Sequence, residues 1–130
     1  MRVSNAFALR LTVHRPEQRT AALLDEVDRF SKLPGAHRAF VRTLRGLATP
    51  VGLKDLQEFA DDARKLSAKT LVVWGDKDKI FPVGQSNRAM ELLPDASLSI
   101  MRNVGHFPQI DAPIPFAELV HRFLARPDSD

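Results

Sequence analysis

The sequence predicts an α/β protein, and two observations carry that prediction. Apolar residues recur at helical spacing through about the first 66 residues, whereas a strand, a helix, a second strand and a second helix are expected in turn from residue 67. The two strands of such a unit run parallel, and the helix between them makes a right-handed crossover. We therefore expect a helical segment over 1–66 and a βαβα segment over 67–130.

Three helices are expected in the first segment. The first begins at Pro16, because proline suits the first helical position, and it ends before Pro34-Gly35. The second covers about 36–48 and the third about 54–66, with a break at 49–52. Such short helices bury little surface alone, so we expect them to form a layer on the second segment. Their inward positions are Ala21, Leu24, Val27 and Phe30, then Phe40, Val41, Leu44 and Leu47, then Leu56, Phe59 and Ala63.

The second segment begins with an apolar, β-branched run at 70–74, typical of a strand buried on both faces in a parallel sheet. A loop at 75–78, a helix from Pro82 to about 93 and a strand at 97–101 follow. Residues 103–115 read as a loop with three prolines, and a last helix covers about 114–125. Inward positions are Ala89, Leu92 and Leu93 in the crossover helix, and Phe116, Leu119, Val120, Phe123 and Leu124 in the last one.

Composition narrows the class of protein. The chain has 130 residues, enough for one domain, and it contains no cysteine, which excludes disulfides, thiolate metal sites and cysteine nucleophiles. No apolar run approaches the roughly 20 residues that span a bilayer, and no signal peptide is visible at the start. We expect a cytoplasmic protein that does not enter a membrane and that needs no cofactor or metal.

The net charge is +3, and Arg38, Arg42 and Arg45 share one face of the second expected helix. This face could bind an anionic partner such as nucleic acid, or it could simply be solvated beside Asp61 and Asp62. No aromatic residues alternate with the arginines on this face as a base-stacking surface requires, so we expect no nucleic-acid partner.

Two polar residues mark a candidate site. In open α/β sheets, ligands gather beyond the carboxyl ends of the strands. Asp78 follows the first expected strand and His106 follows the second, so both should lie at the same edge. A carboxylate bonded to one imidazole nitrogen fixes the tautomer that lets the other nitrogen take a proton. The two side chains could therefore act together as acid and base.

The same residues resemble a family. Leu71 to Trp74 followed by Gly75-Asp76-Lys77-Asp78 and Pro82 is similar to the acid-bearing segment of the α/β-hydrolases. Gly105-His106-Phe107-Pro108, with Asp111, Pro113 and Phe116, resembles the histidine segment of that family. The resemblance implies that Asp78 is the catalytic acid, in preference to Asp76, and that His106 is the catalytic base. It also implies that the helices of 1–66 are the end of a lid, or cap.

One part of the family pattern is missing. The nucleophile of these enzymes occupies a G-x-S-x-G turn between a strand and a helix, and no such turn occurs here. Gly84-Gln85-Ser86 begins one, but Arg88 stands in place of the closing glycine. The oxyanion segment is absent too, so the missing parts are expected before Met1. The chain would then be a truncated product, a piece of a split gene or one half of a two-chain enzyme, acting on a small molecule when completed.

Simpler interpretations stay open. Asp78 could cap the next helix, and His106 could bond only to backbone. His14, His37 and His121 read as surface residues, and the last two lack partners at metal-ligand spacing. Trp74 reads as core, while Phe107 is a candidate substrate-binding residue. The alternative function is a non-catalytic interaction module whose exposed sheet edge pairs with another chain.

Overall fold

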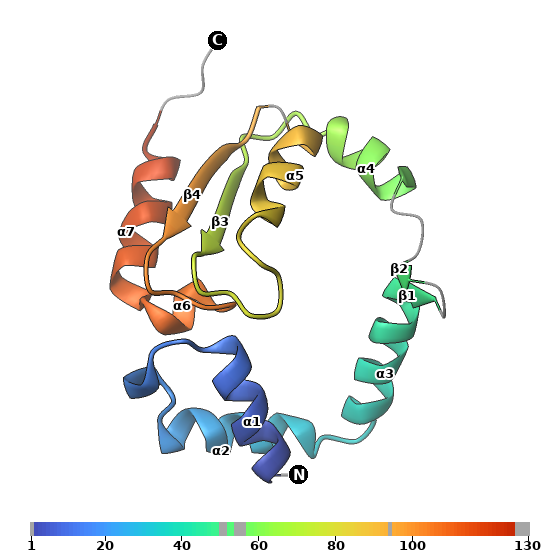
Figure 1. The fold of residues 1–130 in the computed structure, drawn as a ribbon, viewed down its shortest axis with the longest axis vertical. Coiled ribbons are helices and arrows are strands. Elements are labelled where there is room, and N and C mark those ends of the chain that lie inside the picture. Colours follow the sequence, from blue (N-terminus) through green and yellow to red (C-terminus); the bar gives the residue numbers. More distant parts are fainter. Residues whose placement is uncertain (1, 50–51, 54–56, 94, 127–130) are drawn as a thin grey trace.

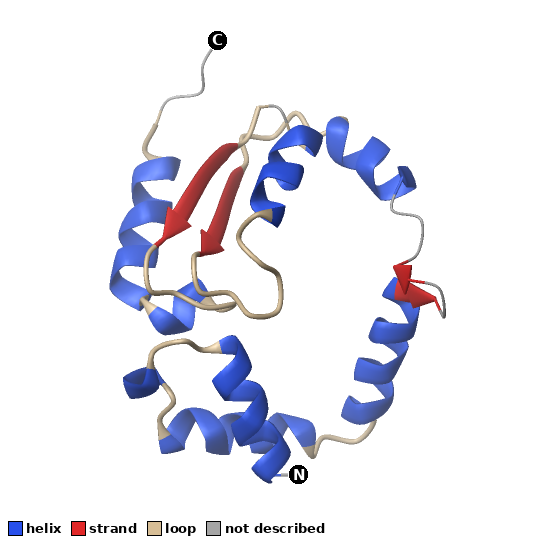
Figure 2. Ribbon diagram, viewed as in Figure 1, coloured by secondary structure: helices blue, strands red, loops and turns tan. Residues whose placement is uncertain are grey.

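The computed structural model of the protein describes residues 2–49, 52–53, 57–93 and 95–126. Its elements run around a ring, in which α1 and α2 are joined through α3 and α4 to the strands β3 and β4 (Figures 1 and 2). The helical part comprises α1 (Arg2–Thr12), the 3-10 helix η1 (Pro16–Gln18), α2 (Ala21–Ser31), α3 (Ala36–Leu47), the paired strands β1 (Ala48–Thr49) and β2 (Gly52–Leu53), and α4 (Gln57–Arg64). The remainder comprises β3 (Leu71–Gly75), α5 (Gln85–Leu92), β4 (Ser97–Met101), α6 (Pro108–Asp111) and α7 (Pro113–Leu124).

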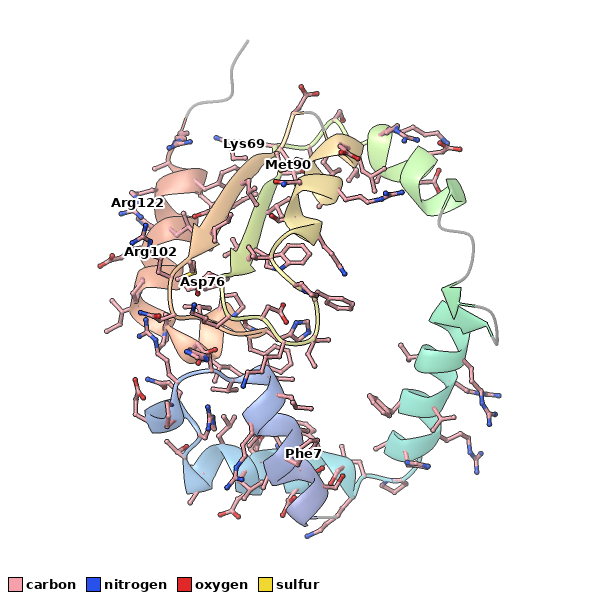
Figure 3. All side chains as sticks on the ribbon, viewed as in Figure 1. Phe7, Lys69, Asp76, Met90, Arg102 and Arg122 are labelled. Carbon is pink, nitrogen blue, oxygen red and sulfur yellow. The ribbon has the colours of Figure 1, made fainter. Side chains whose placement is uncertain are left out.

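The predicted βαβα unit is present. Strands β3 and β4 pair in parallel, from Leu71 opposite Ser97 to Gly75 opposite Met101, and α5 is the crossover between them. Helix α5 begins at Gln85 and not at Pro82, because residues 82–84 form a turn in which Pro82 O accepts the Gln85 N–H at 2.9 Å. Lys69 and Asp76 mark the opposite ends of β3 in Figure 3, and the loops that follow both strands meet at the Asp76 end.

Burial is concentrated away from the strands. Strand β3 is half-buried up to Gly75, not buried on both faces as predicted, since within the described residues only β4 pairs with it. The buried apolar residues are Leu9, Val13, Val104 and Ala112. They come from the end of α1 and from the chain that follows β4, so the tightest packing joins the two halves of the protein beside the strand ends.

The first helices differ from the prediction in two ways. Helix α1 was not anticipated, because Arg10 and the residues after it break the apolar pattern. Pro16 opens the short η1, and the long helix begins only at Ala21, where the hydroxyl of Thr20 caps it by accepting the Leu23 N–H at 3.1 Å. Phe30 is 51% exposed, so its predicted inward placement is wrong, and Ala21 is exposed as well.

Helix α3 matches the prediction in extent but not in burial. It lies across the ring from β3 and β4 (Figure 1), and Phe40 is 63% exposed as a result. The arginines of the basic face, Arg38, Arg42 and Arg45, are exposed too. Helix α4 spans Gln57–Arg64 and contacts α5, while the predicted start at Lys54 lies outside the described residues. The predicted inward positions Leu44, Leu47, Leu56 and Phe59 lie outside the described side chains.

The last part of the chain is more regular than expected. Residues 108–111 form the short α6 inside the predicted loop, with Pro108 at its first turn, and α7 begins at Pro113. Leu124 is 70% exposed, so its predicted inward placement is wrong, because the final turn of α7 leaves it facing solvent. Among the described helices, none combines the length and the apolar character needed to cross a membrane.

Candidate active site

Asp78 lies in the loop that follows β3, with its side chain only 6% exposed. Its Oδ1 accepts two backbone N–H groups, from Ile80 at 2.8 Å and from Phe81 at 2.9 Å. An aspartate that bonds to the backbone two and three residues ahead stabilises a tight turn. This turn uses one carboxylate oxygen and leaves Oδ2 directed at the loop that follows β4.

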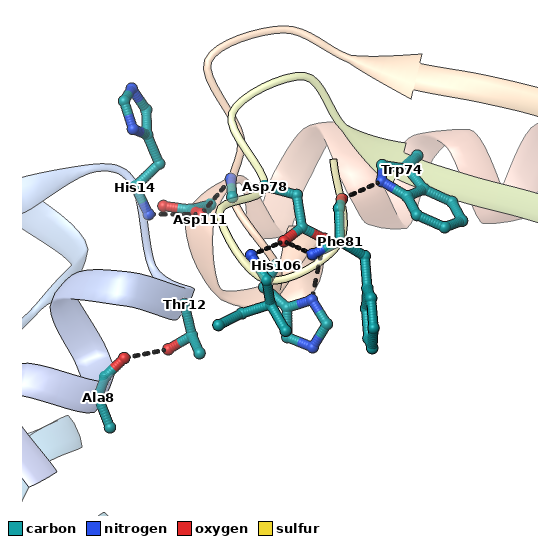
Figure 4. A network of polar contacts seen from close by, with 10 residues as sticks. Ala8, Thr12, His14, Trp74, Asp78, Phe81, His106 and Asp111 are labelled. Atoms are coloured by element: carbon teal, nitrogen blue, oxygen red, sulfur yellow. Dashed lines mark hydrogen bonds and ion pairs between the residues drawn. The ribbon is translucent and has the colours of Figure 1, made fainter. Parts of the chain in front are cut away.

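His106 occupies that loop. Its Nδ1 lies 2.9 Å from Asp78 Oδ2, so the structure brings the two predicted residues together. An ionised carboxylate only accepts hydrogen bonds, so Nδ1 carries the proton and donates it. Figure 4 shows the second ring nitrogen, Nε2, on the side of the ring away from Asp78. The imidazole is 25% exposed, and Nε2 is thus left for chemistry.

Two phenylalanine rings flank the imidazole. The centroid of Phe81 lies 5.4 Å from that of His106, and the centroid of Phe107 lies 5.0 Å away on its own segment. Both pairs are tilted, an arrangement favoured by aromatic rings. Phe107 was predicted to bind substrate, whereas Phe81 was missed. The available signal for Phe81 was its position three residues after the acid, which returns it to the site through the same turn.

A cavity of about 150 Å³ opens beside the pair. Trp74 lines it although the sequence favoured a purely core role, and the indole N–H donates to Phe81 O at 2.9 Å, which ties the turn to the strand. Phe107 is not among the residues that line this cavity. Among the described residues the lining contains no serine or threonine, and it consists of Val73, Trp74, Gly75, Asp78, Phe81, His106 and Pro108.

Two glycines allow the loops to approach. A Cβ on Gly75 would lie 2.2 Å from the carbonyl oxygens of both Val104 and Gly105, far inside any normal contact. A Cβ on Gly105 would lie 2.7 Å from the Thr12 carbonyl oxygen. The distance between Asp78 and His106 therefore depends on the absence of side chains at these positions.

The other predicted residues lie elsewhere. Asp76 Oδ1 is 3.4 Å from the Val104 N and its Oδ2 is 3.8 Å from the Lys77 ammonium, so it serves the loop and not the imidazole. Ser86 is buried in α5 and its hydroxyl donates to Val83 O at 2.7 Å, so it does not occupy an exposed turn as the nucleophile of a G-x-S-x-G motif does. Within the described part of the chain, no three His, Asp or Glu side chains gather as a metal site would require.

The sequence that carries these residues matches a known family. The family model for the alpha/beta hydrolase fold matches residues 7–113. The chain belongs to the α/β-hydrolase family. This membership agrees with the parallel pairing of β3 and β4.

Curated α/β-hydrolases resemble the chain over much of its length. It is 37% identical over 78 residues to a 2-hydroxymuconate semialdehyde hydrolase of Pseudomonas putida, covering 60% of this chain and 28% of that protein. It is 34% identical over 88 residues to a 2-hydroxy-6-oxononadienedioate/2-hydroxy-6-oxononatrienedioate hydrolase of Escherichia coli, covering 68% of this chain and 29% of that protein. The chain thus spans less than a third of the length of these relatives.

Solved structures give the same picture of the fold. A serine hydrolase involved in carbazole degradation superposes with a TM-score of 0.77 at 25% identity, over 96% of this chain and 47% of that one. A meta-cleavage product hydrolase from Pseudomonas fluorescens superposes with a TM-score of 0.73 at 23% identity, over 95% and 45%. Less than half of each of these folds is therefore represented here.

Proposed function

We propose that this α/β-hydrolase chain supplies the acid and the base of a catalytic triad, Asp78 and His106, and that the nucleophile belongs to a part of the protein outside these 130 residues. The observation that carries the proposal is the 2.9 Å contact between His106 Nδ1 and Asp78 Oδ2 at the ends of two parallel strands. The described residues that line the adjoining cavity include none with a hydroxyl or thiol group, which supports the second half of the proposal.

The geometry suits general base catalysis. Asp78 holds the imidazole in the Nδ1–H form, so Nε2 can take the proton of an attacking hydroxyl group and later return it to the leaving group. Asp78 also stabilises the positive charge that appears on the ring. The acyl group would pass to the nucleophile and then to water, which is hydrolysis.

The missing part would attach beside β3. Strand β3 pairs with β4 along one edge only among the described residues, and an open edge is a ready site for another strand. Ile80 and Phe81 are 40% and 46% exposed beside the catalytic pair, which is expected of a pocket whose second wall lies elsewhere. In this proposal residues 1–66 form the cap-like segment and 67–130 the C-terminal part of the catalytic core.

The substrate class follows from the relatives. We propose a conjugated 2-hydroxy-6-oxo acid, like the compounds for which the Pseudomonas putida and Escherichia coli enzymes are named. The apolar wall formed by Val73, Trp74 and Phe81 suits a flat, conjugated chain. The alternative of a non-catalytic interaction module gains no support from the comparisons, since the curated relatives reported above are hydrolases.

The experiment is to join the chain to the polypeptide encoded directly upstream, either as one protein or by mixing the two. Hydrolysis of 2-hydroxymuconate semialdehyde is followed by its absorbance, with a nitrophenyl ester as the comparison substrate. Turnover of the first, saturating with substrate, supports the proposal. Turnover of the ester alone would reject the substrate class, and no turnover of either by a well-folded completed protein would reject the function.

A further inference from the structure

The carboxylate of Asp111 is completely buried, with 0% of the residue exposed. Its oxygens accept three backbone N–H groups, one from the preceding loop and two from the N-terminal part of the chain. Oδ2 accepts from Gly105 at 2.7 Å and from His14 at 2.9 Å, and Oδ1 accepts from Arg15 at 2.7 Å. Figure 4 shows Asp111 between His14 and the loop that carries His106. No catalytic step described above uses this carboxylate.

A second set of bonds crosses the same contact in the opposite direction. The Thr12 carbonyl oxygen accepts the N–H groups of His106 at 2.7 Å and of Phe107 at 3.3 Å. Residues 12–15 and 105–111 are thus joined by donors and acceptors on both sides, and Val13 in the first of these segments is fully buried. Asp111 is the side chain that accepts the backbone N–H groups in this join.

No described lysine or arginine side chain neutralises Asp111. Arg15 instead directs its Nε to Asn103 O at 3.1 Å, and Arg19 directs its guanidinium to the carbonyls of Val13 and His14. A buried carboxylate is tolerated when hydrogen bonds satisfy its oxygens, and such charge-assisted bonds are about twice as strong as neutral ones. The buried carboxylate is therefore stable only while the backbone N–H groups of residues 14, 15 and 105 keep their positions.

We infer that Asp111 is the positioning residue for His106. The inference rests on the proposed catalytic role of His106 and extends it. Asp78 orients the imidazole ring, but Asp111 fixes the backbone on which the ring is carried, through the N–H of the preceding residue, Gly105. Because the same carboxylate binds His14 and Arg15, the position of Nε2 also depends on the helical segment. Movement of that segment would move the base.

The test replaces Asp111 with asparagine and with glutamate in the chain itself. An amide group presents one acceptor oxygen and an NH₂ group, so Asp111→Asn sets a donor against at least one of the three N–H groups. Asp111→Glu keeps a carboxylate with two acceptor oxygens. The matched control is Asp28→Asn, which changes another buried carboxylate, at the contact between α1 and α2, where Asn5 Nδ2 donates to it at 2.6 Å.

Two readouts are taken by NMR. Amide exchange of Gly105, His14 and Arg15 should accelerate roughly 10- to 100-fold in Asp111→Asn, in line with the cost of an unsatisfied buried donor. The ¹⁵N shifts of the neutral imidazole report its tautomer, and the single Nδ1–H form of His106 should become a mixture. Asp111→Glu should restore that single form, and Asp28→Asn should leave it unchanged even if it lowers stability as much.

The inference is overturned if Asp111→Asn leaves both readouts as in the unmodified chain, or if Asp28→Asn changes the tautomer equally. If Asp111→Asn does not fold, amide exchange in the unmodified chain is measured instead. The inference predicts that the amides of His14, Arg15, Gly105 and His106 exchange through one common opening. Separate openings would contradict the join. Activity of the completed protein tests the proposed function independently: a fully active His106→Ala variant would reject that function while leaving the NMR result intact.

Discussion

The imidazole Nδ1 of His106 lies 2.9 Å from the Oδ2 atom of Asp78, although 28 positions separate the two residues in the sequence. The parallel pairing of β3 with β4 produces this approach, because the loop after each strand leaves the same edge of the sheet. Two glycines bring the loops together, and the Asp78 turn directs one oxygen outward. Each of these features predicts a measurable effect.

Replacing Asp78 with asparagine should reverse the tautomer of His106. The amide oxygen would take the place of Oδ1, which accepts the N–H groups of Ile80 and Phe81, and the NH₂ group would then face Nδ1. A donor in that position requires an unprotonated Nδ1, so the proton should move to Nε2. ¹⁵N NMR of the neutral imidazole measures the change. Asp76→Asn is the matched control and should leave the tautomer as it is. If the two variants behave equally, Asp78 is not the residue that sets the tautomer of His106.

Gly75→Ala should strongly destabilise the chain. The new Cβ would lie 2.2 Å from two backbone carbonyl oxygens, and backbone cannot move aside as a side chain can. Overpacking typically costs 1–3 kcal/mol, and we expect about 3 kcal/mol or more here. Gly84→Ala is the control, since nothing lies within 4 Å of the corresponding position. Urea unfolding gives both values, and a loss below about 1 kcal/mol for Gly75→Ala would mean that the loops are not so closely packed.

Much of this arrangement could be predicted from the sequence, and the reasons are local. The run from Leu71 to Trp74 and the segment 97–101 lie in the predicted strands because their patterns reflect the strands themselves. The placement of Asp78 and His106 at one edge followed from topology alone. Membership of the α/β-hydrolase family, indicated by the motifs around these two residues, is confirmed.

What could not be predicted depends on partners far away in the sequence. Asp111 was noted only as part of the histidine segment, because its partners are backbone N–H groups at 14, 15 and 105, which leave no mark on residue type. Phe81 reaches the site through the turn at Asp78, and the Trp74 indole on β3 is tied to that turn by its hydrogen bond to Phe81 O. Phe30 and Phe40 have the helical spacing of inward residues, yet no described neighbour covers them enough to bury them.

The exposed pair Glu26–Arg29 on α2 predicts a pH effect. The hydrogen bond from Arg29 lowers the pKa of Glu26 below its ordinary value of 4.5. A depressed carboxyl pKa means that the pair contributes stability above about pH 4.5, and that this contribution is lost as the pH falls through the lowered value. Arg29→Gln should return the pKa of Glu26 toward 4.5 in an NMR titration, whereas Arg38→Gln should not change it. Because both side chains are about half exposed or more, thermal stability at neutral pH should scarcely change.

The isolated chain should have no measurable hydrolase activity. Loss of the nucleophile alone costs on the order of 10⁶ in turnover in triad enzymes, because the triad acts as a unit. The roughly 10³- to 10⁴-fold catalysis that survives such a loss comes from the oxyanion hole and substrate binding, for which the chain shows no motif. The measurement is hydrolysis of nitrophenyl acetate by the chain and by its His106→Ala variant. Equal rates are expected, and saturable turnover above the variant would mean that a hydroxyl group of this chain is the nucleophile.

The most direct test of the account is the kcat of the completed protein with and without the His106 imidazole. His106→Ala removes the proposed base, whereas His37→Ala removes an exposed imidazole from α3 and is the matched control. We predict that kcat falls by at least about 10⁴-fold in His106→Ala, as expected when one member of a triad is lost, and changes less than about twofold in His37→Ala. A His106→Ala enzyme that retains more than about a tenth of the original kcat would contradict the account, because the base would then lie elsewhere.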